Sequence, residues 1–269
     1  MTTIAHISDL HFGVAVPSVV EGLARHLIEH PPSLLVVSGD LTQRARAGQF
    51  AEARKFLDRF PWPRLVIPGN HDVPLYDVVR RFSSPLGRYR EQIQEELNPL
   101  FQNDEVLVAG VNTARSLTWK SGRISHAQMD QLAKRLAQGG ARLKVVVTHH
   151  PFIPSPLSPK AGIDLGRAAQ ALTILEQHKV DLLLAGHLHH GYAGDTRTHF
   201  ASATRSIISV QAGTAVSRRV RREPNAFNWI TVQPDTLLIQ MLAWDGRGFQ
   251  PAKRTRYRKR DGAWLPEPA

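Results

Sequence analysis

Side chains that bind metal ions recur in the sequence, each shortly after an apolar run. They are two carboxylates, one amide and four imidazoles: Asp9, Asp40, Asn70, His11, His149, His187 and His189. Because the chain has no cysteine, thiolate metal sites and disulfides are excluded. Oxygen and imidazole ligands suit Mn, Fe, Zn, Co or Mg better than copper(I) or an iron–sulfur cluster. The residue types therefore predict a site for divalent cations.

These candidate ligands lie at the carboxyl ends of short runs that we expect to form strands. The runs are 4–8, 34–38, 65–67, 143–147 and 180–184. Ligands of α/β sheets bind at this edge, and neighbouring strands lie ~4.8 Å apart, so distant parts of the chain can converge there. Asp9 and His11 are two positions apart, as are His187 and His189, so each pair would point the same way from an extended chain.

Glycines precede three of the ligand motifs. Gly39, Gly69 and Gly186 would permit a sharp turn and a close approach of backbone and metal. Each polar residue also has an ordinary interpretation, because a lone Asp or Asn after a strand usually forms a turn or a helix cap. Five such placements in order, with an Asp-X-His and a Gly-His-X-His pattern among them, favour one shared site instead.

The elements that must position this site alternate between strands and helices, and then change to strands alone. Helical patterns cover 16–29, 49–60, 125–137 and 165–178, with one or two more helices in 75–101, and further strands are expected at 106–111, 207–211, 228–232 and 237–243. This order predicts an α/β sandwich of two sheets with helices outside. We expect one domain over 1–269, in which 1–190 carry the metal motifs and 191–269 form antiparallel strands and a basic C-terminal tail.

Composition narrows the class of protein further. The chain has 269 residues, of which 42% are hydrophobic, as in an ordinary soluble domain. No signal peptide is recognisable, and the longest apolar runs are far shorter than the ~18 residues that a membrane helix needs. We therefore expect a cytoplasmic protein without a transmembrane segment. A peripheral position at a membrane and a homodimer both stay open.

The net charge of +11 is concentrated in two basic clusters. The first is Arg218, Arg219, Arg221 and Arg222, and the second is Lys253, Arg254, Arg256, Arg258, Lys259 and Arg260. Such clusters can bind an anionic lipid surface or nucleic acid. The plainer alternative is a solvated basic tail.

Taken together, the motifs closely resemble those of the calcineurin-like metallophosphoesterase superfamily. The resemblance extends from residue 4 to about residue 190 and includes all five motifs in the family's order. It implies a four-layer α/β/β/α sandwich of two mixed sheets flanked by helices, and two divalent metal ions. It also implies the ligand sets, in which Asp9, His11 and His189 hold one ion, Asn70, His149 and His187 hold the other, and Asp40 bridges the two.

The resemblance also assigns the residues of catalysis. His71 would contact the substrate phosphate or leaving group, and Asp72 would support the site. Two divalent ions ~3.5–4 Å apart can activate a bridging hydroxide for in-line attack on phosphorus. His71 would stabilise the transition state or protonate the leaving oxygen. Asn70, His71 and His150 are the candidate substrate-binding residues.

Details of the motifs indicate a branch of the superfamily. The stretch 39–45 lacks the pattern of serine/threonine protein phosphatases, and His71 stands where enzymes that cleave UDP-diacylglucosamine typically have Arg. The sequence is most similar to the bacterial cyclic-nucleotide and glycerol phosphodiesterases, which implies a small phosphodiester substrate of the 3',5'-cAMP type. Phe12, Tyr76 and Phe152 are candidates to stack on a base, or they simply pack the motif loops.

Two other functions remain as alternatives. The basic clusters motivate a hydrolase of lipid-linked pyrophosphate or of nucleic-acid phosphodiesters. A non-catalytic metal-binding scaffold is the third, but such relatives usually lose ligands, and all seven are present here.

Overall fold

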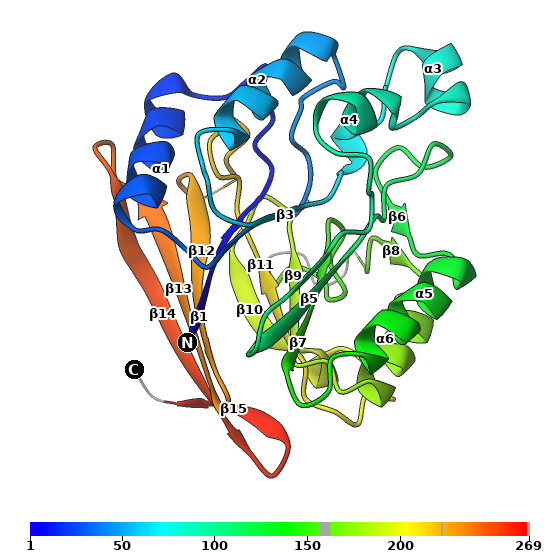
Figure 1. The fold of residues 1–269 in the computed structure, drawn as a ribbon, viewed down its shortest axis with the longest axis vertical. Helices are drawn as coiled ribbons and strands as arrows, with labels where there is room; N and C mark the ends of the chain where they lie inside the picture. The colour runs from blue at the N-terminus through cyan, green and yellow to red at the C-terminus, as the bar shows by residue number, and fades with distance from the viewer. Residues whose placement is uncertain (157–161, 222, 268–269) are drawn as a thin grey trace.

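The computed structural model describes residues 1–156, 162–221 and 223–267, and it contains two facing sheets with helices on both outer faces (Figure 1). The first sheet has the order β15 (Ala263–Glu267), β14 (Phe249–Arg260), β13 (Thr236–Trp244), β12 (Ala226–Gln233), β1 (Thr2–Ile7), β2 (Leu34–Val37) and β3 (Arg64–Val66). The second has the order β10 (Tyr192–Asp195), β11 (Ile208–Gln211), β9 (Leu182–Ala185), β7 (Leu143–Thr148), β5 (Val106–Val111) and β4 (Leu100–Gln102). Both sheets mix parallel and antiparallel pairs, as expected.

Helices cover the two outer faces of this pair of sheets. They are α1 (Pro17–Glu29), α2 (Ala47–Leu57), α3 (Val78–Ser83), α4 (Gly87–Gln92), α5 (His126–Ala137) and α6 (Ala168–Gln177). One apolar cluster joins α1 and α2 to the first sheet, and another joins α5 and α6 to the second. The short strands β6 (Gly122–Arg123) and β8 (Leu165–Gly166) pair beside them. The four-layer α/β/β/α sandwich is therefore confirmed.

Alternation along the strands explains these layers. On β1, Ile4 faces the core between the two sheets, whereas Ala5 and Ile7 face the helices. On β5, Val108 faces the same inner core, whereas Leu107 contacts the layer of α5 and α6. Because successive side chains of a strand point to opposite faces, a strand buried on both sides reads as an unbroken apolar run. This is why the strands were visible in the sequence.

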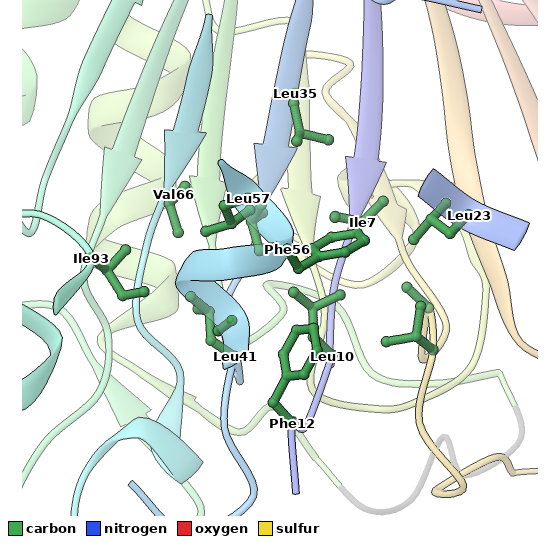
Figure 2. Close-up of a cluster of buried hydrophobic side chains, with 14 of the residues drawn as sticks. Ile7, Leu10, Phe12, Leu23, Leu35, Leu41, Phe56, Leu57, Val66 and Ile93 are labelled. Carbon is green, nitrogen blue, oxygen red and sulfur yellow. The ribbon is translucent and has the colours of Figure 1, made fainter. Parts of the chain in front are cut away.

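Apolar residues within the ligand motifs fasten those loops to the core. Leu10 and Phe12 alternate with Asp9 and His11, and both are buried in the cluster under α2, as Figure 2 shows. The ring of Phe12 lies 5.8 Å from that of Phe56 on α2. The same segment therefore packs one set of side chains into the core and presents the other set to the candidate site.

The segment 75–101 contains two helices, as expected, but both are short. They are α3 and α4, and the edge strand β4 follows them. The two helices are separated by Ser84, Pro85 and Leu86, because proline disfavours helical backbone in the residue before it. The buried face of α3 carries an arginine, so the helical period in this segment does not mark a hydrophobic core.

The C-terminal strands also differ from the expected arrangement. We expected antiparallel strands over 191–269. β12 to β15 are antiparallel and extend the first sheet beside β1, whereas β11 pairs parallel with β9 in the second sheet. The second basic cluster is not a free tail, since it lies within the strand β14, which pairs with β13 along the cluster and also with β15 from Arg256 on. Across the described residues, no helix is long and apolar enough to cross a membrane.

Candidate metal centre

The predicted ligands converge where the carboxyl ends of β1, β2 and β3 meet those of β7 and β9. The reason that we gave for the paired ligands was nevertheless wrong, because the chain is not extended there. Asp9, His11, His187 and His189 have left-handed backbone, with φ of 54°, 45°, 74° and 56°, and Asp40 has 53°. Such values are uncommon outside glycine and are typical of functional sites. Each tight turn directs its side chain back over the sheet edge.

Close packing of the ligand loops explains the glycines that precede the ligands. A Cβ atom at Gly69 would lie 2.1 Å from Oδ1 of Asp40, and one at Gly186 would lie 1.8 Å from the Ser8 hydroxyl. At Gly39, whose φ is +101°, a Cβ would lie 2.6 Å from Nδ1 of His149. The glycines thus let the loops approach one another, which refines our expectation of an approach between backbone and metal.

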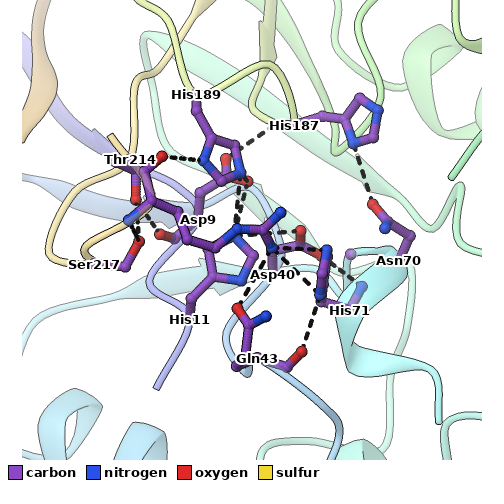
Figure 3. Close-up of polar contacts among 12 residues, drawn as sticks. Asp9, His11, Asp40, Gln43, Asn70, His71, His187, His189, Thr214 and Ser217 are labelled. Carbon is purple, nitrogen blue, oxygen red and sulfur yellow. Dashed lines mark hydrogen bonds and ion pairs between the residues drawn. The ribbon is translucent and has the colours of Figure 1, made fainter. Parts of the chain in front are cut away.

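One group of donors consists of Asp9, His11, Asp40 and His189, all of them buried. Oδ1 of Asp9 lies 3.1 Å from Nε2 of His189 and 3.6 Å from Nε2 of His11. The two imidazole nitrogens are 3.2 Å apart (Figure 3). The donor atoms of this group all lie within 4.8 Å of one another, so a single cation could reach all of them.

A second group lies on the other side of Asp40. Oδ1 of Asn70 is 3.1 Å from Nε2 of His149 and 3.1 Å from Nδ1 of His187. Oδ1 of Asp40 is 3.4 Å from Nε2 of His149, whereas its Oδ2 is 3.7 Å from Nε2 of His11. The two oxygens of this one carboxylate therefore face different donor groups.

The electrostatics of these residues fit divalent cations. Asp9 and Asp40 are fully buried, and their ion pairs within the described part of the chain are with histidines alone. Burial opposes ionisation, yet His189 and His11 hold the pKa of Asp9 well below its usual value. Burial also disfavours a charged His149, but Asp40 raises the pKa of that imidazole to about 9. Two buried carboxylates that need positive neighbours are a suitable donor set for metal ions.

Backbone carbonyls fix the orientation of two of the imidazoles. Nδ1 of His149 donates to the carbonyl of Ser38 at 2.8 Å, and Nδ1 of His189 donates to the carbonyl of Arg219 at 2.7 Å. A carbonyl can only accept, so when either ring loses its second proton, as a metal ligand must, its lone pair lies on Nε2, which faces the other donors. Second contacts of this kind are what orient metal-binding histidines in proteins.

Comparison with protein families gives this geometry a name. Residues 2–191 match the family model described as calcineurin-like phosphoesterase. The chain belongs to this family. It is therefore a phosphoester-hydrolysing enzyme of a metal-dependent family, and the described residues include His and Asp groups that could hold metal.

Curated relatives of this phosphoesterase include several phosphodiesterases. A probable cyclic nucleotide phosphodiesterase of Synechococcus is 24% identical, over 71% of this chain and 74% of the relative. The 3',5'-cyclic adenosine monophosphate phosphodiesterase CpdA of Escherichia coli is 27% identical, over 64% of this chain and only 59% of the relative's length. A cAMP/cGMP dual specificity phosphodiesterase of Mycobacterium tuberculosis is 24% identical, over 80% of this chain and 67% of the relative.

Solved structures support the fold of the phosphoesterase. A purple acid phosphatase from yellow lupin superposes with a TM-score of 0.72, at 12% identity, over 95% of this chain and 53% of that one. A Vps29 mutant from Entamoeba histolytica superposes with a TM-score of 0.50, at 14% identity, over 95% and 99% of the two chains. At such low identities these similarities concern the fold alone.

His71 lies beside the two donor groups, on the wall of the site pocket. Its Nδ1 donates to the carbonyl of Gln43 at 2.9 Å, and its Nε2 accepts from the guanidinium of Arg219 at 2.8 Å. Because a carbonyl only accepts and a guanidinium only donates, this imidazole is neutral and carries its proton on Nδ1. In this arrangement the cationic donor beside His71 is Arg219.

Asp72 lies behind the site pocket and contacts the loops that carry the predicted ligands. It is buried, it does not line the site pocket, and it accepts hydrogen bonds from the backbone N–H groups of Leu41, Thr42 and Gly69. Burial and the neighbouring Asp40 raise the pKa of Asp72 to about 7, against the effect of those donors. Asp72 therefore ties together the loops that carry Asp40 and Asn70, as the expected supporting residue.

His150 and two of the aromatic candidates also lie away from the pocket. His150 is fully buried, with Nδ1 2.7 Å from the hydroxyl of Thr113 and Nε2 2.8 Å from the carbonyl of Lys120. Although it lies close to His149 and His187, both its ring nitrogens are already engaged, so the structure gives it a packing role instead of substrate binding. Phe12 and Phe152 are core residues, as the plainer interpretation stated.

Sequence reasoning assigned the first basic cluster to the surface, but the structure brings part of it to the site. Arg219 and Arg221 line the pocket together with Arg44, Trp119 and Lys120. Arg222 lies outside the described residues. Sequence spacing could not predict this contact, because the strands β10 and β11 separate the Gly-His-X-His motif from the arginine cluster.

Proposed function

We propose that this phosphoesterase is a phosphodiesterase that uses two divalent cations and acts on a cyclic nucleotide of the 3',5'-cAMP type. The observation that carries the proposal is Asp40, whose two oxygens face two separate groups of donors. Asp9, His11 and His189 would hold one cation, Asn70, His149 and His187 the other, and Asp40 both. The curated relatives named as cyclic nucleotide phosphodiesterases supply the substrate class.

The chain's own residues would divide the work as follows. When bound, two divalent cations supply positive charge for the phosphoryl oxygens and acidify water. Arg219 would donate to a phosphoryl oxygen, a role in which a fixed guanidinium stabilises the charge that develops in the transition state. His71 would position the guanidinium of Arg219 by accepting its hydrogen bond, and Asn70 would border the phosphate, because all three residues line the same pocket. Mn, Fe, Zn and Co all suit these ligands.

The sharpest test of this function compares substrates on one preparation. Protein loaded with Mn²⁺ is expected to hydrolyse bis(p-nitrophenyl) phosphate faster than p-nitrophenyl phosphate, and to open 3',5'-cAMP. Chelation should remove both activities, and added Mn²⁺ should restore them. A strong preference for the monoester, or activity that survives chelation, would refute the proposal.

Arg219 offers a test of phosphate binding that leaves the metal ligands intact. In Arg219→Ala, we expect kcat/KM for the diester to fall about 10–100-fold, because one cationic donor to the phosphoryl group is lost. Metal content should not change, since the carbonyl of Arg219 that orients His189 belongs to the backbone. Arg219→Lys should restore part of the activity, and the exposed neighbour Arg218→Ala is the matched control. Equal effects at the two arginines would contradict this role.

A second candidate function rests on the other basic cluster. Arg254, Arg256, Arg258 and Arg260 are exposed at alternate positions of β14 and so share one face of the sheet. Such a row of charges would favour lipid-linked pyrophosphates or nucleic acid as the substrate. This candidate would be favoured over cyclic nucleotides if the enzyme hydrolyses these substrates, if salt weakens that hydrolysis, and if Arg254→Ser with Arg256→Ser reduces it.

We also propose that the enzyme works in the cytoplasm, in keeping with the absence of cysteine.

A further inference from the structure

Helix α3 buries a charged side chain and exposes apolar ones, which is the reverse of an ordinary surface helix. Its Arg81 is only 4% exposed, whereas Val79 is 81% exposed and Phe82 is 59% exposed. A surface helix of a soluble protein turns its apolar stripe to the core and its charges to water. Figure 1 shows α3 at the edge of the molecule, beyond α4 and away from both sheets. The helix therefore offers an apolar face outward.

Arg81 explains why these apolar side chains stay outside. Its guanidinium donates to three backbone carbonyls, those of Pro74, Ser116 and Thr118, at 2.8, 2.7 and 2.7 Å. It also lies 5.3 Å from the ring centre of Trp119. A buried arginine with this many partners takes the place of an apolar core beneath α3. The helix and the loop 115–121 are thereby fastened together as one unit.

That loop extends the same apolar surface. Leu117 is 85% exposed and Trp119 is 67% exposed. Together with the exposed residues on and before α3 they form what we call the rim patch: Tyr76, Val78, Val79, Phe82, Leu117 and Trp119. Single exposed apolar residues are ordinary, but several large ones gathered on one helix and on the loop that Arg81 fastens to it indicate a surface that contacts a partner or a membrane.

The rim patch adjoins the opening of the active site. Trp119 belongs to the patch and also lines the site pocket. Its carbonyl accepts a hydrogen bond from Nδ2 of Asn70 at 3.4 Å. Whatever the patch contacts therefore lies directly beside the candidate metal ligands.

Charges around the rim patch are positive. Arg44 lies 5.7 Å from the ring centre of Tyr76, and Lys120 is exposed next to Trp119. Asp77 is the single acidic residue within 74–88 and 115–121, and it pairs with Arg80 at 3.4 Å. Two copies of this patch face to face would bring like charges together, so self-association is disfavoured. The complementary surface is apolar in its interior and anionic at its edge.

We propose that the rim patch docks the enzyme on an anionic lipid bilayer. Val79, Phe82 and Leu117 would enter the acyl boundary, Trp119 would lie at the level of the headgroups, and Arg44 and Lys120 would contact lipid phosphates. This inference is independent of the substrate proposed above. It places the pocket at the membrane surface, whatever diester the enzyme cleaves.

Vesicle flotation tests the proposal directly on the full chain. We expect the protein to bind vesicles of phosphatidylcholine mixed with phosphatidylglycerol, and to bind phosphatidylcholine alone far less. In Val79→Ser with Leu117→Ser, binding to the anionic vesicles should fall on the order of tenfold, because two inserted side chains become polar. Activity on a soluble diester should be unchanged, since neither residue lines the pocket.

Controls separate this surface from the other features of the chain. Leu265→Ser replaces an exposed leucine on β15, and Arg254→Ser with Arg256→Ser weakens the basic row of β14. Both variants should bind the anionic vesicles nearly as well as the parent protein. The proposal is overturned if the parent protein does not bind, if these controls lose as much binding as the rim variant, or if sedimentation shows a dimer that the rim variant abolishes. None of these outcomes affects the assay of the soluble diester, so the two proposals fail separately.

Discussion

Replacing Asp40 by alanine is expected to lower kcat by at least about a thousandfold and to remove bound metal. Between the two buried carboxylates of the site, Asp40 is the one that pairs with histidines of both donor groups, with one oxygen toward His11 and the other toward His149. Its Oδ1 also accepts the backbone N–H of His71 at 2.8 Å. Loss of the carboxylate therefore removes negative charge from both cation positions and a contact to the pocket wall.

The Asp40 experiment needs a variant that keeps the shape of the side chain, because alanine could also disturb the loop. Asp40→Asn retains one oxygen but lacks the charge that two cations would share, so we expect it to lose most of the metal as well. Asp130→Ala, an exposed carboxylate on α5, is the control for a lost negative charge. Metal content is measured by elemental analysis, and activity with a soluble diester. A metal content near two per chain in Asp40→Ala would rule out the bridging role.

The strands and the ligand motifs of this enzyme could be predicted from the sequence for the same physical reason. Strands buried on both faces are short apolar runs, and their carboxyl ends are where polar residues stand out, as at Asp40 after β2 and His149 after β7. An apolar run and the polar residue that follows it can be recognised within a few consecutive residues of the sequence. What the sequence could not show was the backbone at Asp9 and His11, where we assumed an extended chain and the structure has left-handed turns.

Contacts between distant segments were the other part that sequence reasoning missed. The guanidinium of Arg219 contacts His71, which is 148 positions away, and no local pattern distinguishes Arg219 from the exposed Arg218. Similarly, the basic residues of β14 read as a solvated tail, because a strand that is exposed on one face carries few apolar residues. In α3 the buried residue is an arginine, so the helix lacks the apolar stripe from which the bounds of a helix are predicted. Each miss arose where tertiary contacts override the local signal.

Asp72 gives the second large expected effect, on stability as well as activity. Its Oδ2 accepts the N–H groups of Leu41 and Gly69 at 3.1 and 2.9 Å, and its Oδ1 accepts the N–H and the hydroxyl of Thr42, both at 2.9 Å. Asparagine would place an NH₂ group at one of these oxygens. In either orientation at least one buried N–H then faces another donor, and such an unsatisfied group costs about 1–3 kcal/mol.

We therefore expect Asp72→Asn to lower the free energy of unfolding by about 2 kcal/mol or more, measured by urea denaturation at pH 8. At this pH the carboxyl of the parent protein, whose pKa is about 7, is mostly ionised and accepts all four bonds. The matched control is Asp245→Asn, because Asp245 also accepts two backbone N–H groups, from Arg247 and Gly248, but in an exposed turn where water can replace it. Equal stability losses in the two variants would mean that burial adds nothing at Asp72. A loss confined to Asp72→Asn, together with a lower kcat, would show that this carboxylate holds the loops of Asp40 and Asn70 in register without touching the substrate.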